Sequence, residues 1–176
     1  GIGRDPGVVT KTIGTASRDY STIAAWEADL DNTGVYMTND EAVGECYNDS
    51  SFTFSSAIAI DTNATLSSIK LTAPRSERHD GTAGTGARLI PATSLYANFC
   101  LRIEDPNVRV EFLEFEFDQQ AGYDTFGIIL PIGKSSTNCD VNGCLFHSLE
   151  NGSVSPAVGV YVQSNVTDTR VHNNFF

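Results

Sequence analysis

Three acidic residues alternate with phenylalanines in the segment VEFLEFEFD. Glu114, Glu116 and Asp118 lie two residues apart, and in a β-strand this period places their side chains on one face. Such side chains are about 7 Å apart, which overlaps the range for carboxylates that flank a glycosidic bond or share a calcium ion. The same alternation is typical of a half-buried strand whose charges face water. We favour this second interpretation, so the three acids remain candidates and no catalytic residue is predicted.

A second candidate is the segment RSERHDGTAGTGARL (residues 75–89), the longest turn-rich stretch of the chain. Its glycines suggest a phosphate-binding loop, but the Lys-Ser/Thr pair that such a loop needs is missing. We therefore expect a loop that protrudes between strands. Arg75, Arg78 and His79 make it the most basic part of an acidic chain, and a candidate contact for a partner.

The elements that position these residues form a repeat in the C-terminal half. Three segments align: NVRVEFLEFEF from Asn107, NCDVNGCLFHS from Asn138 and DTRVHNNFF from Asp168. The alignment places two sets of apolar residues at constant spacings of 31 and 30 residues: Val110, Val141 and Val171, and Phe115, Phe146 and Phe176. A second set of strands precedes these segments and consists of CLRIE, GIILPI and GVYVQS. We interpret EAVGECY and SIKLTA as earlier, looser members of this second set.

Short strands at this spacing fit either a sandwich of hairpins or a solenoid with rungs of about thirty residues. Equivalent residues of a hairpin sheet need not recur at a constant interval, whereas each rung of a solenoid stacks like residues on like. The aligned valines and phenylalanines therefore favour an all-β solenoid.

The same register aligns three charged residues of alternating sign, Arg109, Asp140 and Arg170. Adjacent rungs would then place Asp140 between two guanidinium groups, and opposite charges in neighbouring strands stabilise a register. We favour a surface ion-pair ladder. The alternative is a subsite for an anion or a uronate built on the arginines.

The N-terminal region has one convincing helix pattern. Ile23, Trp26 and Leu30 fall on one apolar face, and Asp19 and Ser21 offer capping oxygens just before it. A solenoid needs a cover over its first rung, because that rung exposes core and strand edges. We expect an N-terminal arm and capping helix over residues 1–40 and parallel rungs over residues 41–176.

The charge and length of the chain limit the classes of function. The 176 residues suffice for one domain, and the formal net charge of -11 argues against a nucleic-acid partner. No stretch approaches the roughly 18 consecutive apolar residues of a membrane span. The chain begins GIGRDPGVV, without the apolar core of a signal peptide.

The cysteines lack the paired spacing of a zinc site, and the three histidines are scattered among them. We expect buried thiols, while a disulfide between Cys139 and Cys144 stays open. No metal site or cofactor is predicted, apart from calcium as a minor alternative at the acidic strand.

The stretch DYSTIAAWEADL, followed by strands with GVYVQSNVTDTRVHNNFF, resembles the right-handed parallel β-helix superfamily that includes pectate lyases and many phage tailspikes. The runs VTKTIGTASRDYSTIAAWEADL, GECYND and RHDGTAGTGARL are similar to uncharacterised β-helix proteins of phages and environmental bacteria. The resemblance covers most of the chain from Val9 and implies a right-handed parallel β-helix with a short capping helix. The superfamily contains lyases, hydrolases, adhesins and inert shafts. Its lyase residues cannot be matched here, so none is carried over.

The preferred hypothesis is a non-enzymatic structural or attachment protein of a phage virion, such as a fibre, spike or capsid decoration, located on the virion or an extracellular surface. The alternative is an enzyme, a polysaccharide lyase or glycoside hydrolase that uses Glu114, Glu116 and Asp118. The segment HNNFF places Phe175 and Phe176 in an unfinished rung, from which we expect further chain or a partner to cover it. The expected partners are other copies of the chain, other virion proteins and a polysaccharide. The resemblance to tailspikes implies that the copies form a trimer.

Overall fold

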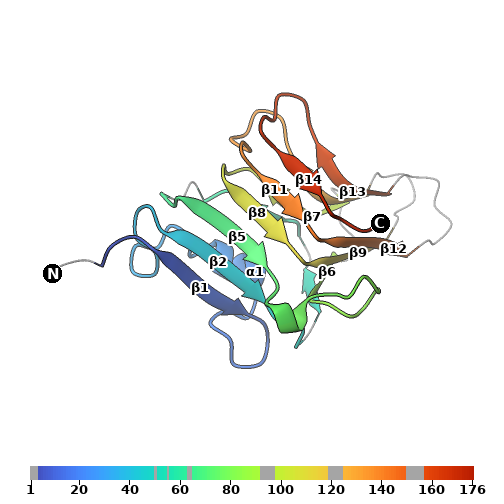
Figure 1. Cartoon of the computed structure of the whole chain (residues 1–176), viewed down its shortest axis with the longest axis horizontal. Helices are drawn as coiled ribbons and strands as arrows, with labels where there is room; N and C mark the ends of the chain where they lie inside the picture. Colours follow the sequence, from blue (N-terminus) through green and yellow to red (C-terminus); the bar gives the residue numbers. More distant parts are fainter. Residues whose placement is uncertain are drawn as a thin grey trace.

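The computed structural model (Figure 1) describes the chain except for short gaps, over residues 4–49, 51–54, 56–62, 65–91, 98–118, 125–149 and 157–176. Within these residues the protein is mostly β, with one short helix, α1 (Ile23–Glu27), and a 3-10 turn, η1 (Arg75–Glu77). The strands form three sheets, and every strand pair in them is parallel. The prediction of an all-β chain is confirmed.

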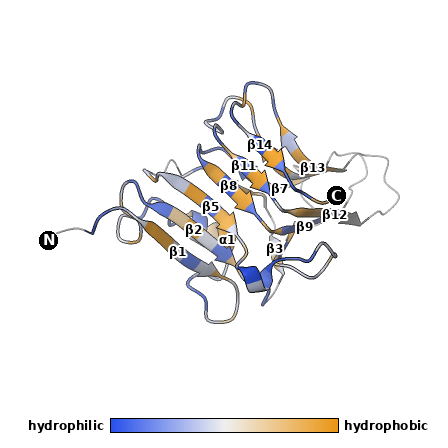
Figure 2. Ribbon diagram, in the orientation of Figure 1, coloured by the Kyte–Doolittle hydropathy of each residue, from blue (hydrophilic) through white to orange (hydrophobic). Residues whose placement is uncertain are grey.

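Sheet A has six strands that lie side by side in Figure 1. In order, they are β1 (Val8–Ile13), β2 (Glu41–Cys46), β5 (Ser68–Thr72), β8 (Val108–Glu111), β11 (Asp140–Asn142) and β14 (Arg170–His172). Figure 2 shows apolar residues recurring in the neighbouring strands β8, β11 and β14. In β8 the alternation is clean, because Val108 and Val110 are buried and Arg109 between them is exposed.

Sheets B and C have four strands each. Sheet B consists of β3 (Phe52–Phe54), β6 (Arg88–Pro91), β9 (Glu114–Asp118) and β12 (Leu145–Leu149). Sheet C consists of β4 (Ile58–Ile60), β7 (Asn98–Ile103), β10 (Thr125–Leu130) and β13 (Ala157–Val162). From β2 onward the chain visits sheets A, B and C in the same cyclic order, so residues about thirty positions apart become neighbours.

The predicted register of the C-terminal repeats is confirmed. Val141 pairs with Val110 on one side and with Val171 on the other. Phe115 pairs with Phe146, and their rings stack with centroids 5.0 Å apart. The Phe146 ring stacks in turn on Phe176 at 5.4 Å. Val171 is 42% exposed, whereas Val110 and Val141 are fully buried, because β14 has a neighbouring strand on one side only.

The earlier repeats differ from the sequence interpretation. The segments EAVGECY and SIKLTA become β2 and β5, which belong to sheet A with Val110 rather than to sheet C with Cys100. The paired residues Glu41 and Ser68 are 27 positions apart, and the paired Ile69 and Val108 are 39 apart. The longer interval contains the loop at residues 75–87, so a fixed period of thirty misaligns these strands.

The N-terminal region also differs in detail. β1 pairs with β2, so the parallel sheet begins at Val8, within the region expected to be an arm. Helix α1 is capped by Thr22, whose side-chain oxygen accepts from the Ala25 N–H, and not by Asp19 or Ser21. Asp19 instead accepts hydrogen bonds from Thr12 of β1. Trp26 lies on the apolar face that the sequence predicts for this helix, and its side chain has no exposed surface.

All four cysteines, at positions 46, 100, 139 and 144, are buried free thiols. The expectation of buried thiols is therefore confirmed, and the alternative of a Cys139–Cys144 disulfide is not. Burial raises the pKa of each thiol, for Cys144 to about 12. In the described part of the chain, no helix has the length and apolar character needed to cross a bilayer.

Candidate functional site

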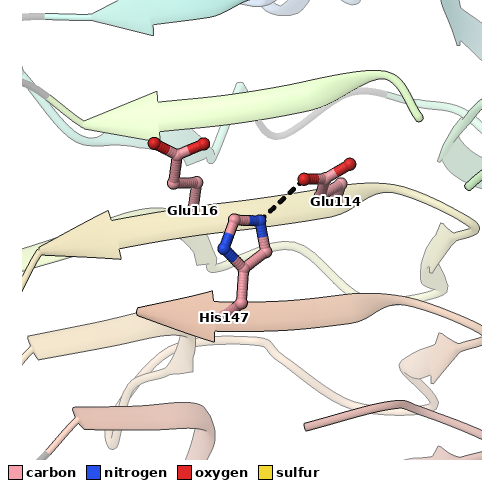
Figure 3. Close-up of side chains that lie close together, drawn as sticks. All are labelled: Glu114, Glu116 and His147. Atoms are coloured by element: carbon pink, nitrogen blue, oxygen red, sulfur yellow. Dashed lines mark hydrogen bonds and ion pairs between the residues drawn. The ribbon is translucent and has the colours of Figure 1, made fainter. Parts of the chain in front are cut away.

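Sheet B brings together the acidic strand and basic residues of its neighbours. Glu114 and Glu116 lie on β9, between Arg88 of β6 and His147 of β12. The register pairs Arg88 with Glu114 and Glu116 with His147. Figure 3 shows the His147 ring reaching across from β12 toward the Glu114 carboxylate. The side chain of the third sequence candidate, Asp118, lies outside the described part of the structure.

The Glu114 carboxylate is fully buried and accepts three hydrogen bonds. The N–H groups of Gly84 and Gly86 donate to Oε1 and Oε2, at 2.5 and 3.2 Å. The Nε2–H of His147 donates to Oε1 at 2.7 Å. A buried charge needs such partners, because leaving it unpaired costs several kcal/mol. Glu114 therefore fastens the loop at residues 75–87 to sheet B, and its oxygens do not face an open site.

Glu116 is paired with the neighbouring strand. Arg88 donates from Nη1 to Glu116 Oε2 at 2.7 Å and from Nη2 to Ser51 Oγ at 3.0 Å. The side chains of Glu116 and His147 keep 15% and 22% of their surface exposed. Together with the partly exposed Arg88, they can be reached by a molecule in solution.

The ligand atoms of Glu114, Glu116 and His147 all lie within 4.8 Å of one another, close enough to test whether the cluster fits a metal ion. Calcium takes six to eight oxygen ligands. This set includes an imidazole nitrogen, the Glu114 oxygens already accept from backbone amides, and Arg88 neutralises Glu116. The residues therefore do not fit calcium, and the cluster is a hydrogen-bond network between three strands and a loop.

The basic loop residues are placed against the protein. Arg78 donates from Nε to the Ala73 carbonyl at 3.0 Å, and its guanidinium lies 3.6 Å above the Phe112 ring. His79 donates from Nε2 to the Gly143 carbonyl at 2.7 Å. Arg75 is exposed and has no hydrogen-bond or ionic partner among the described residues. Of the three candidates for a partner contact, Arg75 is the one whose side chain remains free.

The charged ladder on sheet A has one ion pair within it. Asp140 pairs in register with Arg109 and Arg170, as the sequence predicts. Arg170 Nη2 lies 2.9 Å from Asp140 Oδ2, and His172 Nε2 donates to Oδ1 at 3.0 Å. Both carboxylate oxygens are thus used, and Arg109 forms no ion pair with any described residue. The expected placement of Asp140 between the two arginines is confirmed in register, and among the described residues Arg170 is the one of the two that forms an ion pair with it.

A hollow of about 600 Å³ lies between α1 and the strands β3 and β4. Its wall includes Glu27, whose carboxylate accepts from the Asp61 N–H at 3.2 Å. Burial raises the pKa of Glu27. Sequence reasoning missed this carboxylate because residues far along the chain bury it.

Three members of the sheet B cluster had a signal in the sequence: Glu114 and Glu116 through their alternation with phenylalanine, and His147 through the repeat alignment. The repeat alignment already placed His147 beside Glu116, and that register is confirmed. Arg88 had no comparable signal, since its strand follows the long loop.

Comparison of the chain with protein-family models, curated proteins and solved structures finds no match.

Proposed function

We propose that the three parallel sheets are the faces of a right-handed parallel β-helix, and that it serves as a non-enzymatic structural or attachment protein of a phage virion. The cyclic path through sheets A, B and C supports this fold. So does the stacking of like residues on like, as in the Phe115–Phe146–Phe176 column. In this proposal α1 covers the first rung through the buried Trp26.

The non-enzymatic role rests on the burial and hydrogen bonding of the Glu114 carboxylate. Its carboxylate is fully buried, and both oxygens accept from the backbone of the loop. A general acid or a nucleophile must come within hydrogen-bond reach of the substrate. A carboxylate used in this way instead fixes a loop on a sheet. That role suits a rigid shaft that presents its outer surface to other molecules.

The proposal includes self-association and a location on the virion or another extracellular surface. Tyr161, Val162 and Val171 in β13 and β14 are 41%, 39% and 42% exposed. Exposed apolar side chains on edge strands favour contact with further strands or surfaces. A trimer is the preferred assembly, on the resemblance to tailspikes. Sedimentation velocity across a range of concentrations tests it, and a monomer at every concentration would argue against it.

The second candidate function is a polysaccharide lyase or glycoside hydrolase. It is favoured by the partly exposed Glu116 and His147 beside Glu114. A carboxylate and an imidazole at this separation form an acid–base pair in many enzymes. Against it, both Glu114 oxygens accept from loop amides, and Glu116 is paired with Arg88.

One assay separates the two functions. The purified chain is incubated with acidic and neutral polysaccharides, and new reducing ends and unsaturated products are measured. The attachment function predicts no product above the level of a heat-inactivated sample. Turnover that Glu116→Gln abolishes would establish the enzyme and overturn the structural proposal. Turnover that Glu116→Gln leaves unchanged would point to a contaminating activity, and the structural proposal would stand.

A further inference from the structure

A polar groove of about 220 Å³ lies on the outer face of sheet A, away from the sheet B cluster. It follows the amino-terminal ends of β5, β8, β11 and β14, so it crosses four neighbouring strands. Its charged residues are Arg109, Asp140 and Arg170. Asn107, Asn138, Ser67 and Ser68 supply the rest of its lining.

The charges of the groove leave one guanidinium free. Asp140 is 8% exposed, and Arg170 and His172 occupy its two oxygens. Arg109 is exposed and has no hydrogen-bond or ionic partner among the described residues. A free guanidinium at the wall of a groove is a fork of N–H donors suited to a planar carboxylate.

Two asparagines stand beside this arginine in a fixed arrangement. Asn107 and Asn138 precede β8 and β11 and adopt left-handed backbone conformations, with φ of 58° and 54°. The Asn138 Nδ2 donates to Asn107 Oδ1 at 2.8 Å, which links the two side chains. The side-chain Nδ2 of Asn107 and the side-chain Oδ1 of Asn138 have no hydrogen-bond partner among the described residues. One donor group and one acceptor therefore remain for a ligand, which is the pattern that sugar hydroxyls satisfy.

The size of the groove limits the ligand. Pockets that enclose a whole drug-sized molecule measure about 300–1,000 Å³, so this one accommodates a smaller unit. The net charge of -11 disfavours a polyphosphate ligand, because the protein would repel its negative charges. A ligand with one carboxylate and several hydroxyl groups matches one free guanidinium beside amide and hydroxyl side chains.

We propose that this groove binds an acidic sugar residue of a polysaccharide, with its carboxylate on Arg109 and its hydroxyl groups on Asn107 and Asn138. The inference rests on the attachment function proposed above and names its ligand class. In this arrangement Asp140 is a positioning residue, because its ion pair holds Arg170 of the neighbouring strand β14 at the groove.

The test is a titration of the labelled, full chain with sodium glucuronate, followed by NMR chemical shifts. Glucose at equal concentration serves as the neutral match, and sodium sulfate as the simple anion. We expect saturable shifts at Asn107, Arg109 and Asn138 with glucuronate and much weaker ones with glucose. Arg109→Gln is expected to weaken glucuronate binding about tenfold, the loss that follows removal of a charge-assisted hydrogen-bond pair.

Arg75→Gln is the matched control, because it removes the same charge from an exposed arginine that also lacks a described partner. It should leave the binding of glucuronate unchanged. Equal weakening by both variants, no binding of glucuronate, or sulfate binding as tightly as glucuronate would each overturn the proposal. These measurements report binding and not the degradation of a polysaccharide, which is the readout that tests the attachment function. Failure of this site is therefore distinguishable from failure of the attachment function.

Discussion

His147 of β12 donates to the fully buried Glu114 of β9 at 2.7 Å, from the strand that follows it in sheet B. The same carboxylate accepts from Gly84 and Gly86 of the preceding loop. One side chain thus joins two neighbouring strands and a loop that lies 28–30 residues earlier in the chain. These hydrogen bonds hold β9, β12 and the loop at residues 75–87 together on the outer face of sheet B.

Replacing Glu114 should therefore release the loop. In Glu114→Ala the two glycine amides and His147 lose their acceptor, and a buried unsatisfied group costs about 1–3 kcal/mol. We expect a loss of at least this size in the free energy of unfolding, measured by urea denaturation. Hydrogen exchange at the Gly84 and Gly86 amides should also accelerate.

Glu111→Ala is the control for this prediction. Glu111 lies on β8 of sheet A, is not fully buried, and has no described hydrogen bond or ion pair. Its replacement should change stability by less than about 0.5 kcal/mol, as for an ordinary surface substitution. If Glu114→Ala were as mild as Glu111→Ala, the loop would not depend on this carboxylate.

The helix α1 should contribute to stability through Trp26. The ring has no exposed surface, its Nε1–H donates to Tyr36 Oη at 2.9 Å, and a Cβ added at Gly44 of β2 would lie 2.8 Å from it. Trp26→Ala should cost about 3–5 kcal/mol, as for other buried aromatic residues. Trp26→Phe keeps part of the packing and should cost less. An unchanged melting temperature in Trp26→Ala would show that the helix does not cover the sheet.

The aromatic column should depend on the glycines beside it. A Cβ added to Gly127 of β10 would lie 2.7 Å from the Gly159 carbonyl oxygen and 2.8 Å from the Phe146 ring. Gly127→Ala should therefore destabilise the protein by about 1–3 kcal/mol through overpacking. Gly7→Ala is the control, because a Cβ there meets no atom within 4 Å. Equal stability of the two variants would contradict this account of the column.

The regular part of the fold was predictable because parallel stacking repeats residue types at a fixed interval. Val110, Val141 and Phe146 could be aligned from the sequence, since the pairs Val110–Val141 and Phe115–Phe146 are both separated by 31 residues. β2 and β5 could be recognised as strands but not assigned to the correct sheet. The loop at residues 75–87 lengthens one interval to 39 residues, and periodicity does not reveal an insertion of unknown length.

The candidate site was predictable only in part. The alternation of Glu114 and Glu116 identified their common face, but it also suggested that both faced water. The burial of Glu114 comes from Gly84 and Gly86, whose position over β9 no local pattern encodes. The ladder on sheet A was correct in register, yet register fixes backbone neighbours and not the direction of a long side chain such as Arg109.

Calcium should not change the stability of the protein. The Glu114, Glu116 and His147 cluster offers an imidazole nitrogen and two carboxylates that already have partners, whereas calcium needs six to eight oxygen ligands. We expect the melting temperature in about 5 mM calcium chloride, a concentration above the roughly 1 mM Kd of the weakest extracellular sites, to equal that in excess EDTA. An increase with calcium that Glu116→Gln abolishes would show that the cluster rearranges to bind the ion.

The N-terminal segment should lose stability in acid through Asp40. This buried carboxylate accepts from Arg4 and from the N–H groups of Gly7 and Met37, the last two at 2.8 and 2.7 Å. The hydrogen bonds from Arg4, with those from the two amides, hold the pKa of Asp40 well below its usual range. Because the folded pKa is lower than the unfolded one, the contribution to stability is fully present above the unfolded value. It is lost as the pH falls from there toward the folded value.

The comparison of Asp40→Asn with the unchanged chain isolates this contribution. The variant should be less stable at pH 7, and the difference should shrink as the pH falls below about 4, the ordinary pKa of an aspartate. Urea denaturation at pH 7, 5 and 3 measures it. Asp31→Asn is the control, because Asp31 is exposed and has no described partner, so its effect should be small and independent of pH. A difference for Asp40→Asn that grew on acidification would reverse the sign and exclude the network as its cause.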